Sequence, residues 1–474
     1  MTVTKADIAI IGGGSGGLSV AAGAAQLGAR VVLFEGGRMG GDCLNSGCVP
    51  SKALLAAAKA AHLASGNPAM GITGSAPAID FAAVKAYVAA VIARIAPHDS
   101  VERFEGLGVT VIREKASFAG PHELVSAGHR VTARFIVIAT GSVPLIPPIP
   151  RLETVPYHTN ETIFTDTEKP AHLLVIGGGP IGVELAQAHR RLGCNVTIIE
   201  AASLLPKDDP ALVALLRQQL EDSGITIIEG NAVTGVTAAD DGTGAITARL
   251  DDGTEMTGSH LLVAAGRAPF TEGLDLAAAG VRHGRGGIIT DARLRTSARH
   301  IYAIGDVTGR PQFTHMAGYH AGIVIRNCLF RLPAKVNDDL VPWVTYCDPE
   351  LAHVGLGAAA AAARHGAANI RVVETPLEAN DRAVAEGRDA GMVKAVMHRN
   401  GRVLGASILA PAAGEMILPW CLALQQKARI GAIASLIAPY PTYGDASKRV
   451  AGSFFTPKLF SPGMRRLVKF LLRF

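Results

Sequence analysis

Two cysteines, Cys43 and Cys48, are separated by four residues in the stretch 40–52, which reads GGDCLNSGCVPSK. A folded loop of this length can bring them to the Cα separation of roughly 4.4–6.8 Å that a disulfide needs. Pro50 falls in the first turn of an expected helix, so Cys48 would lie just before that helix, where unpaired N–H groups stabilise a thiolate. Taken alone, the pair fits a redox dithiol as well as a structural disulfide or two buried thiols.

A dinucleotide-binding signature precedes the two cysteines. An apolar strand is expected over 7–11, followed by three glycines in the spacing G-x-G-x-x-G, at Gly12, Gly14 and Gly17. A helix through Leu27 and a second strand over 30–34 lead to Glu35, 18 positions after the last glycine. Strand, glycines, helix, strand and carboxylate in this register predict a site for the pyrophosphate and ribose of a dinucleotide.

The same pattern occurs a second time. A strand over 173–176 leads to Gly177, Gly179 and Gly182, and the next strand, 195–199, ends at Glu200. A carboxylate at this position binds ribose hydroxyls and repels the 2′-phosphate of NADP, and residues 201–205 contain no arginine for that phosphate. The sequence therefore predicts two bound dinucleotides, an electron relay between them, and NADH preferred over NADPH.

Length and composition indicate a large globular protein. The chain has 474 residues, which is too long for a single hydrophobic core, so several domains are expected. Of these residues, 49% are hydrophobic and 18% are charged, as is typical of a folded globular protein. A net charge of +5 without a long basic run does not favour nucleic acid as a partner. Six scattered cysteines are no secreted disulfide framework and favour a cytoplasmic protein. Four of them are expected to be ordinary buried thiols: Cys194, Cys328, Cys347 and Cys421.

The N-terminal region is not expected to be a membrane span or a signal peptide. Residues 8–29 carry no charge, but seven glycines lie among them. The N-terminus also lacks a basic region followed by a cleavage site. We expect no transmembrane segment and no resident metal site.

Together, the two signatures and the string from Cys43 to Lys52 resemble the class I pyridine nucleotide–disulfide oxidoreductases, a group that includes dihydrolipoamide dehydrogenase, glutathione reductase and mercuric reductase. The resemblance covers nearly the whole chain. It implies an α/β flavoprotein with two Rossmann-like domains and an α+β dimerisation domain, acting as a homodimer. The implied boundaries are 1–148 with 270–341 for FAD, 149–269 for NAD, 342–456 for dimerisation, and a tail over 457–474.

The resemblance also implies roles for single residues. Cys48 would be the sulfur near the flavin and Cys43 the one facing the substrate, while Lys52 would lie near the flavin and pair with Glu184. Beyond the first glycine signature and Glu35, FAD contacts are implied at Ala116, Thr140, Gly141, Ser142, Asp306, Gln312, Phe313, Thr314 and His315. NAD contacts beyond the second signature are implied at Glu184, Val233 and Gly266. On its own, Asp306 would equally fit a cap for the helix expected after His315.

The chain departs from the family at its C-terminal end. Where dihydrolipoamide dehydrogenase and glutathione reductase carry a catalytic His-Pro…Glu pair, this chain has Tyr440 and Asp445, expected to act across a two-fold dimer. A phenol with a pKa near 10 is a poor base at neutral pH. Mercuric reductase also carries a tyrosine in this region, but its terminal cysteine pair has no counterpart after Cys421.

Several acceptors remain compatible with this pattern: Hg(II) or another soft metal ion, a small disulfide, or a quinone-like molecule. Dihydrolipoyl dehydrogenase is an alternative enzyme that Tyr440 disfavours. A third reading is a slow redox sensor or membrane-docked module that holds FAD and NAD.

The last segment, 461–474, is expected to be a basic amphipathic helix. At about 100° per residue, one arc holds Arg465, Arg466, Lys469 and Arg473, and apolar side chains fill the other side. Such a helix fits packing on the protein's own dimer with a solvated basic face, and it also fits peripheral contact with an anionic membrane.

Overall fold

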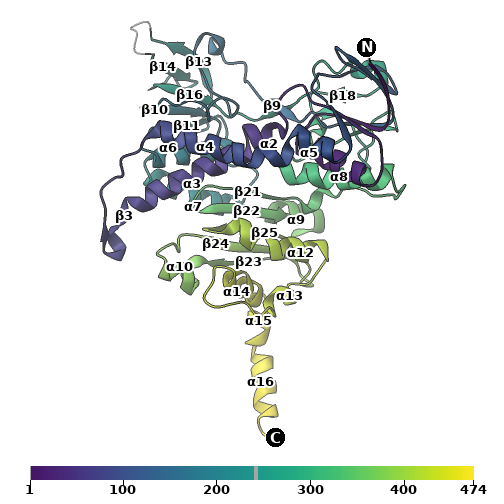
Figure 1. Cartoon of the computed structure of the whole chain (residues 1–474). Helices are drawn as coiled ribbons and strands as arrows, with labels where there is room; N and C mark the ends of the chain where they lie inside the picture. Colours follow the sequence, from purple (N-terminus) through teal and green to yellow (C-terminus); the bar gives the residue numbers. More distant parts are fainter. Residues whose placement is uncertain (1, 240–243) are drawn as a thin grey trace. The chain divides into compact units, whose positions relative to one another are not determined.

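The computed structural model describes residues 2–239 and 244–474, which form two compact units (Figure 1). The first unit comprises Met1–Ala202 and Gly224–Asp338, and the second comprises Ser203–Ser223 and Asp339–Phe474. The α/β architecture with two Rossmann-like sheets and a separate α+β region is the one that the sequence predicts.

A largely parallel sheet forms the N-terminal part of the first unit. Its strand order is β5-β2-β1-β8-β7-β6, with β20 added beside β8. The strands β2 and β20 and the C-terminal halves of β1 and β8 are apolar and largely buried; α1 packs on β1 and β2, and α8 packs on α1. The bounds are β1 Thr2–Ile11, α1 Ser15–Gln26, β2 Val31–Phe34, β5 Val109–Ile112, β6 Ser117–Gly120, β7 Glu123–Val125, β8 His129–Ile138, β20 Ile301–Ala303 and α8 Thr314–Cys328.

A second parallel sheet repeats this plan with the order β12-β11-β10-β16. The helix α6 follows β10 as α1 follows β1, and an antiparallel sheet β13-β14-β15 lies after β12 in the chain. The short strands β9 and β17 pair where the chain passes between the two sheets. The bounds are β9 Ser142–Pro144, β10 His172–Ile176, α6 Pro180–Arg191, β11 Asn195–Glu200, β12 Ile225–Glu229, β13 Val233–Ala238, β14 Ile246–Leu250, β15 Glu255–Gly258, β16 His260–Val263 and β17 Arg267–Pro269.

The cysteine stretch and its following helices lie between β2 and β5 in the chain. The elements are α2 Gly41–Asn45, α3 Cys48–Ala64, β3 Gly66–Asn67, β4 Ile72–Thr73, α4 Phe81–Ile95 and α5 Val101–Gly106. Within the described residues, one helical run, Phe81–Gly106, is long and apolar enough to cross a membrane by composition alone, which is weak evidence. The run is broken by a 3-10 turn at Ala96–Asp99, and its longest helix has 15 residues, fewer than the roughly 20 of a span.

The second unit is built on an antiparallel sheet in the order β21-β22-β25-β24-β23. Trp420 is fully buried beneath it, and its indole N–H donates to Ser447 Oγ at 3.1 Å. The bounds are α7 Pro210–Asp222, β21 Pro342–Thr345, β22 Glu350–Gly355, α9 Ala358–His365, β23 Ile370–Pro376, α10 Asp381–Ala385, β24 Met392–His398, β25 Val403–Ala410, α11 Ala413–Met416, α12 Leu418–Gln425, α13 Gly431–Ala434, α14 Asp445–Ser453, α15 Thr456–Leu459 and α16 Pro462–Leu471.

Three details differ from the sequence-based expectations. The segment Ser203–Ser223, expected in the NAD domain, groups with the second unit because Asp208 accepts from Trp343 and Asp209 pairs with Lys394. Cys421 is only half-buried, unlike the other three thiols outside the cysteine stretch. The helix α3 begins at Cys48 itself rather than after it.

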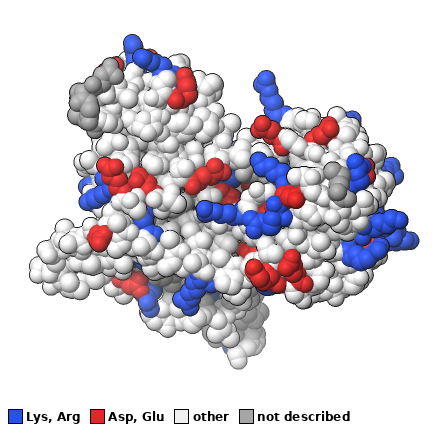
Figure 2. Space-filling view, turned by 45° about the horizontal axis from the view of Figure 1, so that its top comes forward, with Lys and Arg blue, Asp and Glu red and all other residues white. Residues whose placement is uncertain are grey.

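Charges on one face of the molecule are mixed (Figure 2). On the face drawn in Figure 2, basic and acidic side chains lie interspersed among larger uncharged areas. Such mixing produces no strong single-sign field over that face.

Candidate functional site

The two cysteines lie on consecutive helices of the first unit. Cys43 is on α2, and Cys48 is the first residue of α3, after the N-cap residue Gly47. The turn before α2 uses Gly40 at φ 85° and Gly41 at φ 58°, a backbone conformation that favours glycine. The two thiols do not form a disulfide in this structure, and each shifts the pKa of the other. The loop therefore brings the two sulfur atoms together as a redox pair requires.

The cysteine loop packs directly on the first glycine signature. Gly40 N donates to Gly13 O at 2.9 Å, and a Cβ on Gly41 would lie 2.7 Å from the Cα of Gly14. Ser15, the first residue of α1, is near enough to Cys43 to lower the pKa of its thiol. Only glycines allow this approach, so the sequence places the dithiol beside the predicted FAD pyrophosphate site.

Helix starts surround the pair. Cys48 begins α3, and its Sγ lies 3.3 Å from the hydroxyl of Thr314, which begins α8. Together with α1 this makes three helix N-termini around the dithiol, none with an acidic residue in its first turn. The partial positive charge of these ends stabilises negative charge on sulfur.

The environment shifts the pKa values of the two thiols in opposite directions. The pKa of Cys48 is lowered to about 6, first by the hydrogen bond from Cys43, then by Thr314 and the charge of Lys52. The pKa of Cys43 is raised, chiefly because Cys43 donates that hydrogen bond and is partly desolvated. Cys48 is therefore the thiolate of the reduced pair near neutral pH, in line with the flavin-facing role that the family resemblance implies.

Lys52 and Glu184 meet although 132 positions separate them. Lys52 Nζ lies 2.7 Å from Glu184 Oε2, because α3 packs along α6. Glu184 is buried, whereas Lys52 is half-buried one turn after Cys48. The ion pair thus links α3, which begins with Cys48, to α6, the helix of the second glycine signature. The buried carboxylate of Glu184 fixes the position of the lysine charge.

The first glycine signature has the geometry of a pyrophosphate cradle. Gly12 has φ 110°, and a Cβ there would lie 2.4 Å from Ala139 O. A Cβ on Gly17 would lie 1.9 Å from Gly12 O, so neither position admits a side chain. Gly14 caps α1 without any side-chain hydrogen bond, which leaves the first N–H groups of the helix for an anion. Glu35 Oε2 accepts from Gly13 N at 2.6 Å beside this turn.

The second signature reproduces these contacts. Gly177 has φ 112°, and a Cβ on Gly182 would lie 2.0 Å from Gly177 O. Gly179 caps α6 without a side-chain hydrogen bond. Glu200 accepts from Gly178 N at 2.6 Å and from Ala202 N at 2.9 Å. Both turns therefore fit a dinucleotide, and the residues present fit FAD at the first turn and a nicotinamide dinucleotide at the second.

Asp306 is not a cap of α8. It lies on a 3-10 turn, Gly305–Thr308, and its Oδ2 accepts from Ser142 Oγ at 2.6 Å. The N-cap residue of α8 is Phe313, without a side-chain cap. Burial raises the pKa of Asp306, and the Ser142 hydroxyl opposes this effect. The structure thus brings together the two expected flavin motifs, 140–142 and 306.

Sequence reasoning missed three polar residues that tie these motifs to the dithiol. Arg267 Nε donates to Ser142 Oγ at 2.7 Å, and its Nη2 lies 3.4 Å from Asp42 of the cysteine helix. Asn160 Nδ2 donates to Asp42 Oδ1 and to Ser46 O, each at 3.0 Å. No local pattern signals this network, because its members come from four separate segments.

The remaining predicted site residues lie around these elements. Thr140 donates to Phe270 O at 2.6 Å beside Gly141, and Phe313 stacks on His315 with ring centroids 5.2 Å apart. Other positions are the buried Ala116 before β6, Gln312 before α8, Val233 at the start of β13, and Gly266 before β17. Their cofactor contacts stay predictions.

Tyr440 and Asp445 lie in the second unit. Tyr440 is 70% exposed, and its hydroxyl donates to Asp381 Oδ2 at 2.7 Å. This hydrogen bond and the charge of Asp381 raise the pKa of Tyr440. Asp445 begins α14 and lies 3.6 Å from Arg449. The phenol therefore loses its proton even less readily near neutral pH than an ordinary tyrosine, and its approach to the dithiol across a dimer stays a prediction.

Two family models together span nearly the entire chain. The pyridine nucleotide-disulphide oxidoreductase model matches residues 6–321, and the dimerisation-domain model of the same family matches 341–451. The match to the dimerisation domain supports a homodimer.

Relatives of known name agree with these models. The mercuric reductase of Streptomyces lividans is 34% identical over 459 residues, which cover 95% of this chain and 96% of that protein. The dihydrolipoyl dehydrogenase of Thermus scotoductus is 36% identical over 451 residues, covering 94% and 96%. A Cu(II) complex of the HOCl-induced flavoprotein disulfide reductase RclA from Escherichia coli superposes with a TM-score of 0.84 and 29% identity, over 94% of this chain and 99% of the other.

These matches agree with the two dinucleotide turns and the paired thiols between them. The family uses FAD and a nicotinamide dinucleotide. The chain belongs to the pyridine nucleotide–disulfide oxidoreductases and is an FAD-dependent enzyme of that family.

Proposed function

We propose that this enzyme takes electrons from NADH, passes them to the Cys43–Cys48 pair, and delivers them to a soft metal ion such as Hg(II). The observation that carries the proposal is the contrast between the low pKa of Cys48 and the raised pKa of Tyr440. The dithiol forms a thiolate readily, but the residue at the expected acid–base position exchanges protons poorly near neutral pH.

This contrast in pKa matters because a disulfide acceptor and a metal-ion acceptor need different chemistry. Reducing a disulfide releases a thiolate that an acid must protonate, and the thiols that attack it must lose protons. A soft metal ion binds thiolates directly and accepts two electrons without a proton. FAD, when bound, transfers the electron pair from the nicotinamide to the sulfur pair. The balance is NADH and Hg(II) consumed, with NAD⁺, one proton and elemental mercury formed.

Within this relay, the residues of the chain have defined tasks. Helix starts, Thr314 and Lys52 hold negative charge at Cys48. Cys43, half-buried beside it, retains its proton until an acceptor displaces that proton. Glu184 fixes Lys52 at a distance of 2.7 Å. Some relatives support this choice of acceptor by name: several are mercuric reductases, and RclA was solved with Cu(II).

The proposal predicts that the wild-type enzyme oxidises NADH faster with Hg(II) than with lipoamide or glutathione disulfide. Tyr440→His supplies a base with a pKa near 6.5 and is expected to raise disulfide turnover about tenfold or more. Steady-state NADH oxidation under each acceptor measures this change. The exposed Tyr87 on α4 gives the control Tyr87→His, expected to leave both rates unchanged. Wild-type lipoamide turnover equal to or above the Hg(II) rate would instead favour dihydrolipoyl dehydrogenase.

Preference for NADH over NADPH rests on Glu200. Its carboxylate is held by Gly178 N and Ala202 N at the ribose end of the second turn. We expect kcat/KM for NADH to exceed that for NADPH by at least about tenfold, and Glu200→Ala with Ala201→Arg to reverse the preference. Glu255→Ala, which removes an exposed carboxylate on β15, is the matched control. Equal use of both cofactors by the wild-type enzyme would refute this assignment.

We further propose that α16 binds an anionic membrane surface. The helix α16 extends from α15 toward the C-terminus (Figure 1). Within its chain no residue of α16 is buried, and Leu472 and Phe474, which follow it, are 81% and 96% exposed. From 446 to the end of the sequence there are seven basic residues and no acidic one. Exposed apolar area beside clustered positive charge complements a lipid surface, where each basic residue contributes about 1 kcal/mol.

Sedimentation with vesicles tests the membrane contact. The full chain is expected to bind vesicles that contain phosphatidylglycerol, and to lose binding when 461–474 are deleted or when Arg466→Glu is combined with Lys469→Glu. The control combines Lys335→Glu with Lys427→Glu, the same charge change at exposed positions outside the tail. If the wild-type chain does not bind the vesicles, and deletion of 461–474 converts the dimer to monomers, α16 packs on the partner subunit instead.

A further inference from the structure

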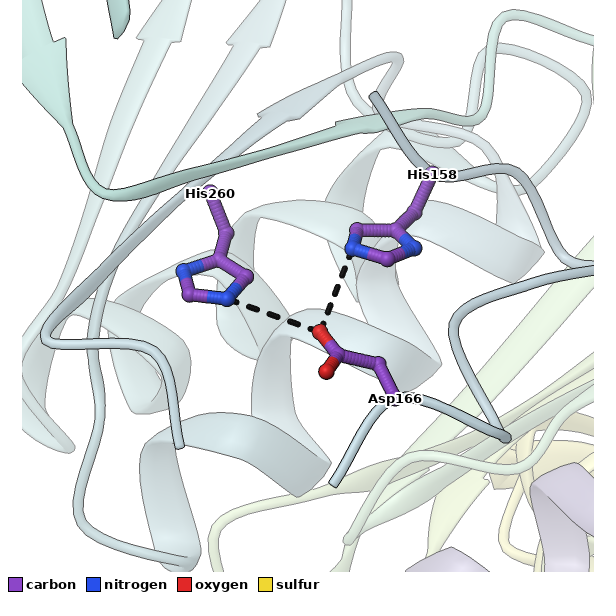
Figure 3. Close-up of side chains that lie close together, drawn as sticks. All are labelled: His158, Asp166 and His260. Atoms are coloured by element: carbon purple, nitrogen blue, oxygen red, sulfur yellow. Dashed lines mark ion pairs between the residues drawn. The ribbon is translucent and has the colours of Figure 1, made fainter. Parts of the chain in front are cut away.

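Two histidines and one aspartate converge at the edge of the NAD-binding sheet, apart from the dithiol (Figure 3). His158 Nε2 lies 3.2 Å and His260 Nε2 lies 3.5 Å from the same atom, Asp166 Oδ2. All three donor atoms lie within 4.8 Å of one another. The rings are nearly parallel, with an interplanar angle of 12°.

The backbone holds these residues in place. His260 is the first residue of β16, and His158 is paired with that strand: its N–H donates to Leu261 O at 2.7 Å, and its carbonyl accepts from Val263 N at 2.8 Å. Asp166 Oδ1 accepts from Glu168 N at 3.0 Å, which leaves Oδ2 turned to the histidines. The three donors are therefore fixed by strand pairing and by a turn, not by chance contact of long side chains.

The other ring nitrogen of each histidine has its own partner. His158 Nδ1 lies 3.2 Å from Thr162 Oγ1, and His260 Nδ1 lies 3.0 Å from Ser259 Oγ. Metal-bound histidines characteristically have such outer partners, which fix the ring and its tautomer. Both Nε2 atoms are thereby left to face the carboxylate.

The donor spacing fits coordination of a small cation. Ligands about 2.0–2.1 Å from a tetrahedral zinc ion lie about 3.3–3.4 Å from one another. The two nitrogen–oxygen separations of 3.2 and 3.5 Å bracket that value. Three protein ligands leave a fourth position for water, and the side chains are 12–25% exposed, so an ion has access.

The charges around the cluster are mixed. His189 is fully buried and neutral, because burial lowers its pKa to about 3. The ammonium group of Lys85 is a positive charge that opposes the binding of a cation at the cluster. This ammonium donates to Ile163 O at 2.5 Å, and burial lowers its pKa to about 8. The carboxylate of Asp166 lies close to both imidazoles, and its negative charge also acts on Lys85.

We propose that His158, Asp166 and His260 form a binding site for a first-row divalent metal ion with nitrogen preference, such as Zn²⁺. This site was not expected from the sequence, and it is separate from the thiolates that receive electrons. By joining the turn of Asp166 to β16, a bound ion cross-links the edge of the NAD-binding domain. Its consequence is a more heat-stable domain.

The test uses the full FAD-loaded chain with Cys43→Ser and Cys48→Ser, so that the thiolates do not bind the ion. Zn²⁺ titration by calorimetry is expected to show one site per chain, weakened at least 30-fold by His260→Gln or Asp166→Asn. Co²⁺ should give visible absorption bands of a four- or five-coordinate ion, and either ion should raise Tm. The control is His283→Gln, at an exposed histidine on β18 (His283–Gly284), and it should change neither Zn²⁺ binding nor Tm.

Two results would overturn the proposal. One is the absence of Zn²⁺ binding at 100 µM while the protein is folded and holds FAD. The other is binding that the double variant His158→Gln with Asp166→Asn leaves unchanged. Circular dichroism of each variant without metal separates loss of the site from loss of fold.

Discussion

Replacing Cys43 or Cys48 with serine is expected to abolish acceptor reduction, with turnover falling at least about a thousand-fold. The two variants should differ in colour. Cys43→Ser leaves Cys48 unable to form the disulfide, so its thiolate persists beside oxidised flavin and gives a long-wavelength absorption band. Cys48→Ser removes that thiolate and the band with it. The expectation follows from the lowered pKa of Cys48 and the raised pKa of Cys43.

Cys421→Ser is the matched control, because Cys421 is a half-buried thiol of the second unit. It should keep full turnover and the native spectrum. Equal bands in both active-site variants would mean that the thiolate assignment is wrong. Undiminished turnover in either one would remove the dithiol from the electron path and favour a sensor or a direct flavin reductase.

Gly182→Ala is expected to reduce the rate of flavin reduction by NADH at least about a hundred-fold while FAD stays bound. The added Cβ would lie 2.0 Å from Gly177 O, so the turn must open and α6 must move away from β10. That shift displaces the N–H groups of the helix start and Glu184, which holds Lys52. Stopped-flow measurement of flavin bleaching under excess NADH records the loss.

Gly106→Ala is the control for this substitution. Gly106 ends α5, and a Cβ there meets no atom within 4 Å. The rate and the FAD content should match the wild type. If Gly182→Ala loses FAD as well, the defect is one of folding. If it reduces flavin normally, the second turn does not bind the nicotinamide dinucleotide.

The sequence was most informative where backbone geometry permits only glycine. Gly12, Gly17, Gly177 and Gly182 have no room for a side chain, and their spacing, in register with the flanking strands, helix and carboxylate, indicated both dinucleotide turns. Alternation of apolar strands and helices likewise predicted the two parallel sheets. These features depend on backbone conformation and on neighbouring residues in the chain, so a short stretch of sequence contains the information that determines them.

Other parts of the site depend on contacts between distant segments. The network of Arg267, Asp42 and Asn160 joins residues more than 100 positions apart, and the His158–Asp166–His260 cluster has no motif spacing. Both groups form only when strands pair and helices pack, and these contacts cannot be predicted from a short stretch of the sequence.

The central claim is that NADH reduces a Cys43–Cys48 pair through FAD, and an anaerobic titration with NADH tests it most directly. After two electrons, the account predicts a long-wavelength absorption band at pH 7–8 that fades below pH 6, as the Cys48 thiolate with its pKa of about 6 becomes protonated. Direct bleaching of the flavin without such a band at any pH would contradict the account.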